Sequence, residues 1–146
     1  MTDLHIGPAS TTDLGAVLDF WKAAAEGTSI SDDLAGVERL HERDPEALLL
    51  ARCAGCDRCE GELVGTVIAG FDGWRCHLYR LAVHPGHRRR GIGAALLAAA
   101  EERFVALGGR RGDAMVLDRN ERAHRVWGAV GYRPEEQWTR WVKPLG

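Results

Sequence analysis

The sequence predicts a single α+β domain in which helices cover a mixed sheet. Its 146 residues match the usual size of one domain. Hydrophobic residues make up 45% and charged residues 27%, which is the balance of a globular chain. The hydrophobic periodicity changes along the chain in the order strand, two helices, three strands, helix, strand, helix, strand. That order indicates one continuous domain over residues 1–146, with layers of helices and strands.

The N-terminal third is predicted to hold one strand and two helices. Residues 4–6 form a short apolar strand that Gly7-Pro8 closes. The polar run at 10–13 then supplies N-cap residues for a helix whose apolar side chains recur at helical spacing up to Trp21. A second helix is expected from about Asp32 to Glu42, before Asp44-Pro45 ends it.

Three strands are expected in the middle of the chain, at residues 47–52, 63–71 and 74–83. Asp72-Gly73 is a two-residue hairpin signal between the second and third of these. Because the links between the strands are short, we predict an antiparallel meander.

The C-terminal part is predicted to alternate helices with strands. A long helix begins near Gly91 and runs to about Leu107, where Gly108-Gly109 ends it. A short strand at 114–117 and a helix that starts after Asn120 follow, and a final strand is expected at 137–142. The predicted inward face of the long helix consists of Ile92, Leu96, Leu97, Phe104 and Leu107.

Charge and hydropathy argue against nucleic-acid and membrane partners. The net charge is −2, so the field of the whole domain does not attract a polyanion. The longest apolar run, residues 92–100, is about half as long as a membrane-spanning helix. The N-terminus carries neither a basic region nor an apolar signal segment. We therefore expect a cytoplasmic protein.

Four cysteines raise the question of a metal site. Cys53, Cys56 and Cys59 form a CxxCxxC run, while Cys76 stands at the far end of the following strand. At about 3.3 Å per residue that strand separates Cys76 from the others by about 30 Å, too far for a fourth zinc ligand. A cytoplasmic location also disfavours disulfides. We predict free loop thiols and no metal.

The stretch Arg88-Arg-Arg-Gly91-Ile-Gly93 lies between a strand end and a helix start. Glycines at such a place let backbone N–H groups approach an anion, and arginine can add charged contacts to phosphate. No lysine follows as in a P-loop, and Leu96 replaces the third glycine of a dinucleotide fingerprint. From spacing alone, an anion-binding loop and a solvated turn before an ordinary helix remain open.

The motifs of this region extend beyond the loop. The segment L-Y-R-L-A-V-H-P-G-H-R-R-R-G-I-G-A-A-L-L at residues 78–97 resembles the acyl-CoA-binding motif of the GNAT N-acetyltransferase superfamily. The pattern N-x-x-A-x-x-x-W-x-x-x-G-Y at 120–132 is similar to a second motif of that family. The resemblance covers essentially the whole chain. It implies a three-layer α/β/α fold with a mixed, mostly antiparallel sheet of six to seven strands, and acetyl-CoA as cosubstrate.

The resemblance also implies which residues bind acetyl-CoA. Backbone amides of the glycine loop would hold the pyrophosphate, the main chain around Val83 would bind the pantetheine arm, and Asn120 would contact that arm. The residues implied in cofactor binding are Leu81, Ala82, Val83, Arg88, Arg89, Arg90, Gly91, Ile92, Gly93, Ala94, Asn120 and Trp127.

Acetyl transfer to an amine needs a base for the amine and a proton for the departing thiolate. In relatives, groups six and four residues before the position of Val83 often serve, and these are His77 and Tyr79 here. Their spacing of two puts both on one strand face if no bulge intervenes. Tyr132 and Tyr79 are candidates for the thiolate's proton donor. A packing role for His77 beside Trp74 is the alternative.

Departures from the family pattern leave several roles open. Trp127 stands where the family commonly has a tyrosine that protonates the thiolate, and Met115 stands where a glutamate is common. Asp32, Asp33 and Glu26 in or near the first helix–helix loop are alternative bases or amine-binding groups, although a solvated helix N-terminus explains the two aspartates equally well.

Two functions follow from the resemblance. The first is an N-acetyltransferase that acetylates a primary amine of a small molecule or a protein by direct attack in a ternary complex. The second, motivated by Trp127 and Met115, is a non-catalytic acyl-CoA-binding sensor. Relatives frequently form dimers, so a homodimer is possible.

Overall fold

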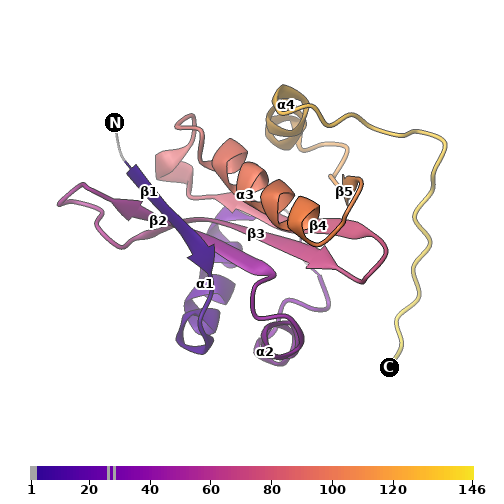
Figure 1. The fold of residues 1–146 in the computed structure, drawn as a ribbon, viewed down its shortest axis with the longest axis horizontal. Coiled ribbons are helices and arrows are strands. Elements are labelled where there is room, and N and C mark those ends of the chain that lie inside the picture. Colours follow the sequence, from indigo (N-terminus) through magenta and orange to yellow (C-terminus); the bar gives the residue numbers. More distant parts are fainter. Residues whose placement is uncertain (1–2, 26, 28) are drawn as a thin grey trace.

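The computed structural model describes residues 3–25, 27 and 29–146, and its centre is a five-stranded sheet with the strand order β1-β2-β3-β4-β5 (Figure 1). The strands are β1 (Asp3–Pro8), β2 (Leu48–Ala54), β3 (Leu63–Phe71), β4 (Cys76–Val83) and β5 (Gly112–Ala114). The helices are α1 (Leu14–Ala24), α2 (Leu34–Arg43), α3 (Ile92–Ala106) and α4 (Glu121–Ala129), with short 3-10 turns η1 (Thr11–Asp13) and η2 (Pro85–His87). Within the described ranges, no helix is both long and apolar enough to cross a membrane.

The sheet is mixed and mostly antiparallel, as predicted. Strands β1 to β4 pair antiparallel in sequence order, and β5 pairs parallel to β4. Figure 1 shows α1 and α2 below the sheet and α3 and α4 above it. Each face of the sheet has its own apolar cluster. One cluster lies between the sheet and helices α1 and α2, and the other lies between the sheet and helices α3 and α4. The expected α+β architecture with helices on both faces is therefore confirmed.

The expected number of strands was too high. The strand predicted at 114–117 is shorter and earlier, at Gly112–Ala114, and residues 133–146 contain no strand. A segment with alternating apolar residues forms a strand only where it can pair with the edge of a sheet. Strand β5, at the edge of this sheet, is only three residues long and gives residues 137–142 very little backbone to pair with. Trp138 and Trp141 of this segment are 71% and 91% exposed.

Helix α3 packs closely on β3. Leu96 and Leu97 are fully buried, and Ile92 and Phe104 are nearly so. A Cβ at Gly65 would lie 2.8 Å from the Leu96 side chain, so only glycine allows this approach. The predicted inward face of α3 is confirmed except at one end. Leu107 is 46% exposed, because it is the C-cap residue rather than part of the helix.

The cysteines differ from the prediction of free thiols. Cys53 and Cys59 form a disulfide, because the turn between β2 and β3 brings their Cα atoms to 5.7 Å. Cys56, on the same turn, and Cys76, buried in the core beneath α3, are free.

A bulge in β4 is stabilised by the buried hydroxyl of Thr66. Trp21 Nε1 of α1 donates a hydrogen bond to Thr66 Oγ1 at 2.9 Å, and that hydroxyl donates to the Arg80 carbonyl at 2.8 Å. Arg80 has a φ of 52°, a left-handed conformation that is uncommon for a residue with a side chain. The register between β3 and β4 shifts at this point. Thr66 thus ties α1, β3 and the bulge of β4 together.

Replacing Thr66 with valine should destabilise the fold out of proportion to the change in volume. Thr66→Val keeps the shape but removes the acceptor of the Trp21 indole N–H and a donor to the Arg80 carbonyl, and a buried polar group that loses its partner costs about 1–3 kcal/mol. Thr66→Ser keeps the hydroxyl and loses one methyl, about 1 kcal/mol. Urea unfolding of both variants measures the difference, and equal losses would show that the hydroxyl contributes nothing.

Candidate functional site

The glycine loop leads from β4 through η2 into α3. Gly91 is the N-cap of α3 and has a left-handed φ of 76°, which glycine adopts without strain. Since the first N–H groups of a helix have no acceptors within it, those at the start of α3 point out at this loop. A Cβ at Gly93 would lie 3.2 Å from Val126, so this glycine also allows α4 to pack against α3. The loop can therefore bind an anion through its backbone.

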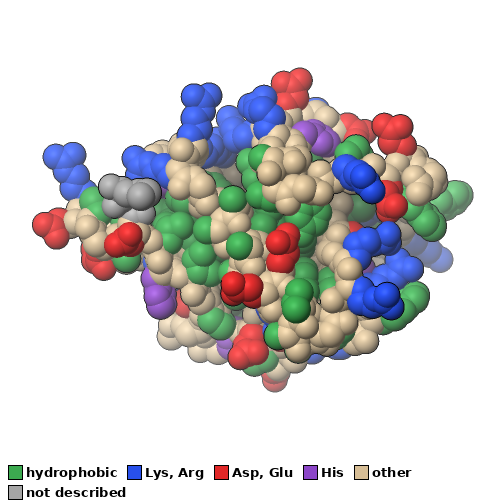
Figure 2. Space-filling model, turned by 45° about the horizontal axis from the view of Figure 1, so that its top comes forward, with side chains coloured by type: hydrophobic (Ala, Val, Ile, Leu, Met, Phe, Trp, Pro, Cys, Tyr) green, Lys and Arg blue, Asp and Glu red, His purple; other side chains and the backbone are tan. Residues whose placement is uncertain are grey.

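Positive side chains accompany these N–H groups. Arg89 and Arg90 are exposed, and Arg89 also has a left-handed φ of 65°. Figure 2 shows Lys and Arg side chains protruding along the upper margin of this face of the molecule. The combination of a helix N-terminus and guanidinium groups matches what a pyrophosphate needs.

Strands β4 and β5 separate before β4 reaches the loop. Their pairing runs from Cys76–Gly112 to Leu78–Ala114 and ends there, while β4 continues to Val83. A pocket of about 110 Å³ lies at this separation. It is lined by Ala25, Leu78, Tyr79, Arg80, Leu81, Met115, Val116, Leu117, Asn120, Ala123 and Trp127. The pocket thus lies along the part of β4 that has no pairing with β5.

Asn120, the N-cap of α4, and Trp127 of α4 form one wall of the pocket. The Asn120 side chain accepts a hydrogen bond from the Ala123 N–H at 3.1 Å and so caps α4. Trp127 is 8% exposed and meets the ring of Tyr132 edge-on at a centroid distance of 4.9 Å. Both residues implied by the second sequence motif therefore line the pocket.

Arg80 connects the pocket to the loop between α1 and α2. Its guanidinium hydrogen-bonds Asp32, with Nε to Oδ1 at 3.1 Å, and lies 5.7 Å from the centre of the Trp21 ring. Asp33 instead caps α2 by accepting the Gly36 N–H at 2.7 Å. Glu26, the remaining acidic candidate, lies outside the described residues. Sequence reasoning missed Arg80, because no local signal marks an arginine for a left-handed bulge.

His77 lies beyond the residues that line the pocket. Its Nδ1 is 2.8 Å from Asp113 Oδ1, and its Nε2 is 3.5 Å from Asp72 Oδ2. The N–H groups of Arg75 and Trp74 lower the pKa of Asp72, so this carboxylate is ionised. The His77 ring is 6.1 Å from that of Tyr79, and the two share one strand face because the bulge follows them. His77 therefore lies next to the pocket residue Tyr79 without lining the pocket itself.

The two tyrosines have different surroundings. Tyr79 lines the pocket, and partial burial, with smaller effects of Asp113 and Asp72, raises its pKa, so the phenol stays protonated. The Tyr132 hydroxyl donates to Glu101 at 2.8 Å and is not among the lining residues. Burial is also the main cause that raises the pKa of Tyr132.

The chain was compared with known families and proteins. The profile of the acetyltransferase (GNAT) family matches residues 17–132. An acetyltransferase of Pectobacterium atrosepticum is 34% identical over 109 residues, covering 75% of this chain and 73% of that protein. An acetyltransferase of Sodalis glossinidius is 30% identical over 124 residues, covering 85% and 83%.

Solved structures share the fold at lower identity. Aminoglycoside N-acetyltransferase AAC(6')-Iy in complex with CoA superposes with a TM-score of 0.73 at 19% identity, covering 99% of this chain and 97% of that one. Ard1 from Thermoplasma volcanium gives 0.72 at 22% identity, covering 88% and 81%. The match of the family profile and the relatives at 30–34% identity, together with this shared fold and the glycine loop at the start of α3, identify the chain as an acetyltransferase of the GNAT family.

Proposed function

We propose that the chain transfers the acetyl group of acetyl-CoA to a primary amine by direct attack in a ternary complex. One observation carries the proposal: the left-handed Gly91 loop follows the end of β4, and a pocket lies along the part of the same strand that is not paired with β5. A pyrophosphate held at the loop would place an extended pantetheine arm beside this strand, since an extended chain can bond to a free strand edge.

Each implied cofactor residue has a role in this arrangement. The N–H groups from Arg88 to Ala94 would hold the pyrophosphate, aided by the positive end of the α3 dipole. The main chain of Leu81–Val83 would pair with the pantetheine arm, and the Val83 N–H would polarise the thioester carbonyl. Asn120 and Trp127, which line the pocket, would contact the arm from the side of α4.

The proposed proton transfers use the groups on β4. Tyr79 is the proposed acid for the CoA thiolate, supported by its place in the pocket wall, and its raised pKa means that the phenol is protonated before the thiolate forms. His77 is the proposed base, oriented by Asp113 and acting through Tyr79 or through water. Tyr132 is the remaining candidate acid, although its bond to Glu101 directs its hydroxyl to another partner.

The acceptor is a primary amine of a small molecule or of a protein. Asp32, which is hydrogen-bonded to Arg80 of the pocket wall, is the proposed carboxylate for a cationic amine. Fold neighbours include an aminoglycoside N-acetyltransferase and a ribosomal-protein-S18-alanine N-acetyltransferase, so both acceptor classes occur on this fold. A homodimer remains part of the proposal, as do the absence of nucleic-acid and membrane partners.

The function is tested in two steps. Calorimetric titration with acetyl-CoA, CoA and ATP should give micromolar binding of the CoA species alone. An amine panel of aminoglycosides, polyamines and peptide N-termini should then reveal the acceptor by acetyl-CoA consumption. Chromatography should be the assay, because the free Cys56 would react with a thiol reagent. No binding would refute the proposal, and binding without turnover on any amine would favour the sensor.

Glu substitution at Gly91 should weaken acetyl-CoA binding. Gly91→Glu places a negative charge where phosphate is expected, so the Kd should rise about tenfold or more, equivalent to about 1.4 kcal/mol. Gly108→Glu is the matched control. Gly108 also has a positive φ, of 89°, and nothing within 4 Å of its Cβ position, but it lies at the other end of α3. Equal effects of the two substitutions on Kd would exclude the loop as the binding site.

Loss of the Tyr79 hydroxyl should slow the reaction without affecting cofactor binding. Tyr79→Phe removes the proposed acid, and general acid catalysis contributes about 10²–10⁴-fold, so kcat should fall at least tenfold. Tyr132→Phe serves as the comparison, and we expect it to lower stability but not kcat. The reverse result, with kcat lost only in Tyr132→Phe, would transfer the role of acid to Tyr132.

His77 is tested separately with His77→Gln, which keeps a polar side chain but removes the base. We expect kcat/KM for the amine to fall about 100-fold, while the Kd of acetyl-CoA stays the same. Isothermal titration and steady-state kinetics measure the two quantities. Unchanged kinetics would remove His77 from the mechanism and leave it as a packing residue.

A further inference from the structure

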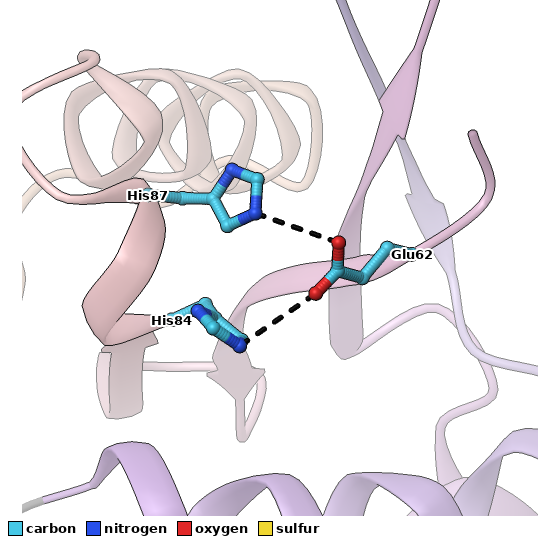
Figure 3. A group of neighbouring side chains, drawn as sticks. All are labelled: Glu62, His84 and His87. Atoms are coloured by element: carbon cyan, nitrogen blue, oxygen red, sulfur yellow. Dashed lines mark ion pairs between the residues drawn. The ribbon is translucent and has the colours of Figure 1, made fainter. Parts of the chain in front are cut away.

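Three side chains that the proposed reaction does not use converge beside the glycine loop. Glu62 directly precedes β3, His84 directly follows β4, and His87 is the last residue of η2. Figure 3 shows both imidazole rings directing Nε2 toward the Glu62 carboxylate. One ligand atom from each residue lies within 4.8 Å of the others, and among the described residues no other group of three His, Cys, Asp or Glu meets this condition.

The distances in this cluster suit metal ligands better than hydrogen bonds. His84 Nε2 is 3.6 Å from Glu62 Oε1, and His87 Nε2 is 3.5 Å from Glu62 Oε2. Both exceed the usual N–H···O length of about 2.7–3.2 Å. Ligands at about 2.0–2.2 Å from a tetrahedral Zn²⁺ are separated by about 3.3–3.6 Å. Each Nε2 thus lies at about this spacing from one oxygen of the Glu62 carboxylate, and one ligand atom from each of the three residues lies within 4.8 Å of the others.

The cluster is also accessible and held by the backbone. The side chains of His84 and Glu62 are 40% and 41% exposed, which leaves room for a solvent ligand, whereas that of His87 is 13% exposed. Backbone bonds fix the ends of the η2 turn, because His87 N–H donates to the His84 carbonyl and His84 N–H donates to Val64 of β3. The two imidazoles are therefore presented by one short turn tied to the strand that Glu62 precedes.

We propose that Glu62, His84 and His87 bind a divalent first-row metal ion of the Zn²⁺ class. The ligands are the two Nε2 atoms and one carboxylate oxygen, and water completes the tetrahedron. Two imidazoles with one carboxylate is a ligand set that suits zinc. The ion links the start of β3 to η2. This site is independent of the proposed acetyl transfer, and it departs from our expectation from sequence that no metal is bound.

Metal binding shifts one proton in each ring. Gly86 N–H donates to His84 Nδ1 at 2.9 Å, and Arg90 Nη1 lies 3.2 Å from His87 Nδ1. Since both neighbours are donors, the neutral rings carry their proton on Nε2. When the metal takes Nε2, the proton moves to Nδ1, and the contacts with Gly86 and Arg90 open. This opposing cost limits the affinity, so we expect micromolar rather than nanomolar binding.

The test is titration of Zn²⁺ into the full, metal-stripped chain with the Cys53–Cys59 disulfide intact. We expect one ion per chain and a higher Tm with Zn²⁺ than without it. Cys56→Ser should bind as the parent does, and loss of binding in this variant would assign the ion to the cysteine turn instead. With Co²⁺ as probe, the intense visible absorption of a tetrahedral site should appear, without thiolate charge-transfer bands.

Substitution of the proposed ligands tests whether the Zn²⁺ ion binds at these residues. His87→Ala and Glu62→Gln should each weaken Zn²⁺ binding at least tenfold. His124→Ala is the matched control, because His124 is an exposed histidine of α4 whose Nε2 contacts the Leu117 carbonyl, and the Zn²⁺ affinity of this variant should not change. Far-UV circular dichroism of the metal-free variants checks that they fold. Zn²⁺ binding that is absent from the parent, or equal in all three variants, would overturn the proposal whether or not acetyl-CoA binds.

Discussion

The shape of the pocket depends on the hydroxyl of Thr66. This group accepts the indole N–H of Trp21 and donates to the carbonyl of Arg80, so one buried atom connects α1, β3 and the bulge of β4. A left-handed arginine in a strand is unfavourable by itself and needs such a partner for its carbonyl. Because the bulge follows Tyr79, it keeps that residue on the same face as His77, and it directs the Arg80 guanidinium to Asp32.

Helix α3 has two roles: its buried face packs in the core, and its N-terminus carries the glycine loop. Its buried face, with Leu96 and Leu97, packs on β3 where Gly65 leaves space, which sets the height of the helix above the sheet. Its N-terminus, opened by Gly91, then follows the end of the strand that has separated from β5. The binding loop is thus positioned by core packing, and the backbone N–H groups need no further support to face an anion. The His84–His87 turn precedes this loop, so an ion bound there would act on the same segment.

Local patterns in the sequence were sufficient for much of the fold. The strand at 63–71 was predicted with its observed bounds, and the start of α4 after Asn120 follows from capping chemistry. Other features depend on partners distant in sequence. The alternation at 137–142 predicted a strand that finds no edge, and the Cys53–Cys59 disulfide follows from a turn that brings two cysteines together. The contact of His77 with Asp113 could not be inferred, because β5 pairs with β4 only after α3 has crossed the sheet.

The sequence by itself determined the α+β class, the order of elements and the glycine loop at the start of α3, because periodicity, caps and glycine are properties of neighbouring residues. The tertiary structure decided which side chains meet. It put Tyr79 and Arg80 in the pocket wall, turned Tyr132 to Glu101, and gathered Glu62, His84 and His87 from the ends of two strands. Such contacts depend on strand register and on the bulge at Arg80. A shift of one residue in register moves every side chain of a strand to the opposite face of the sheet.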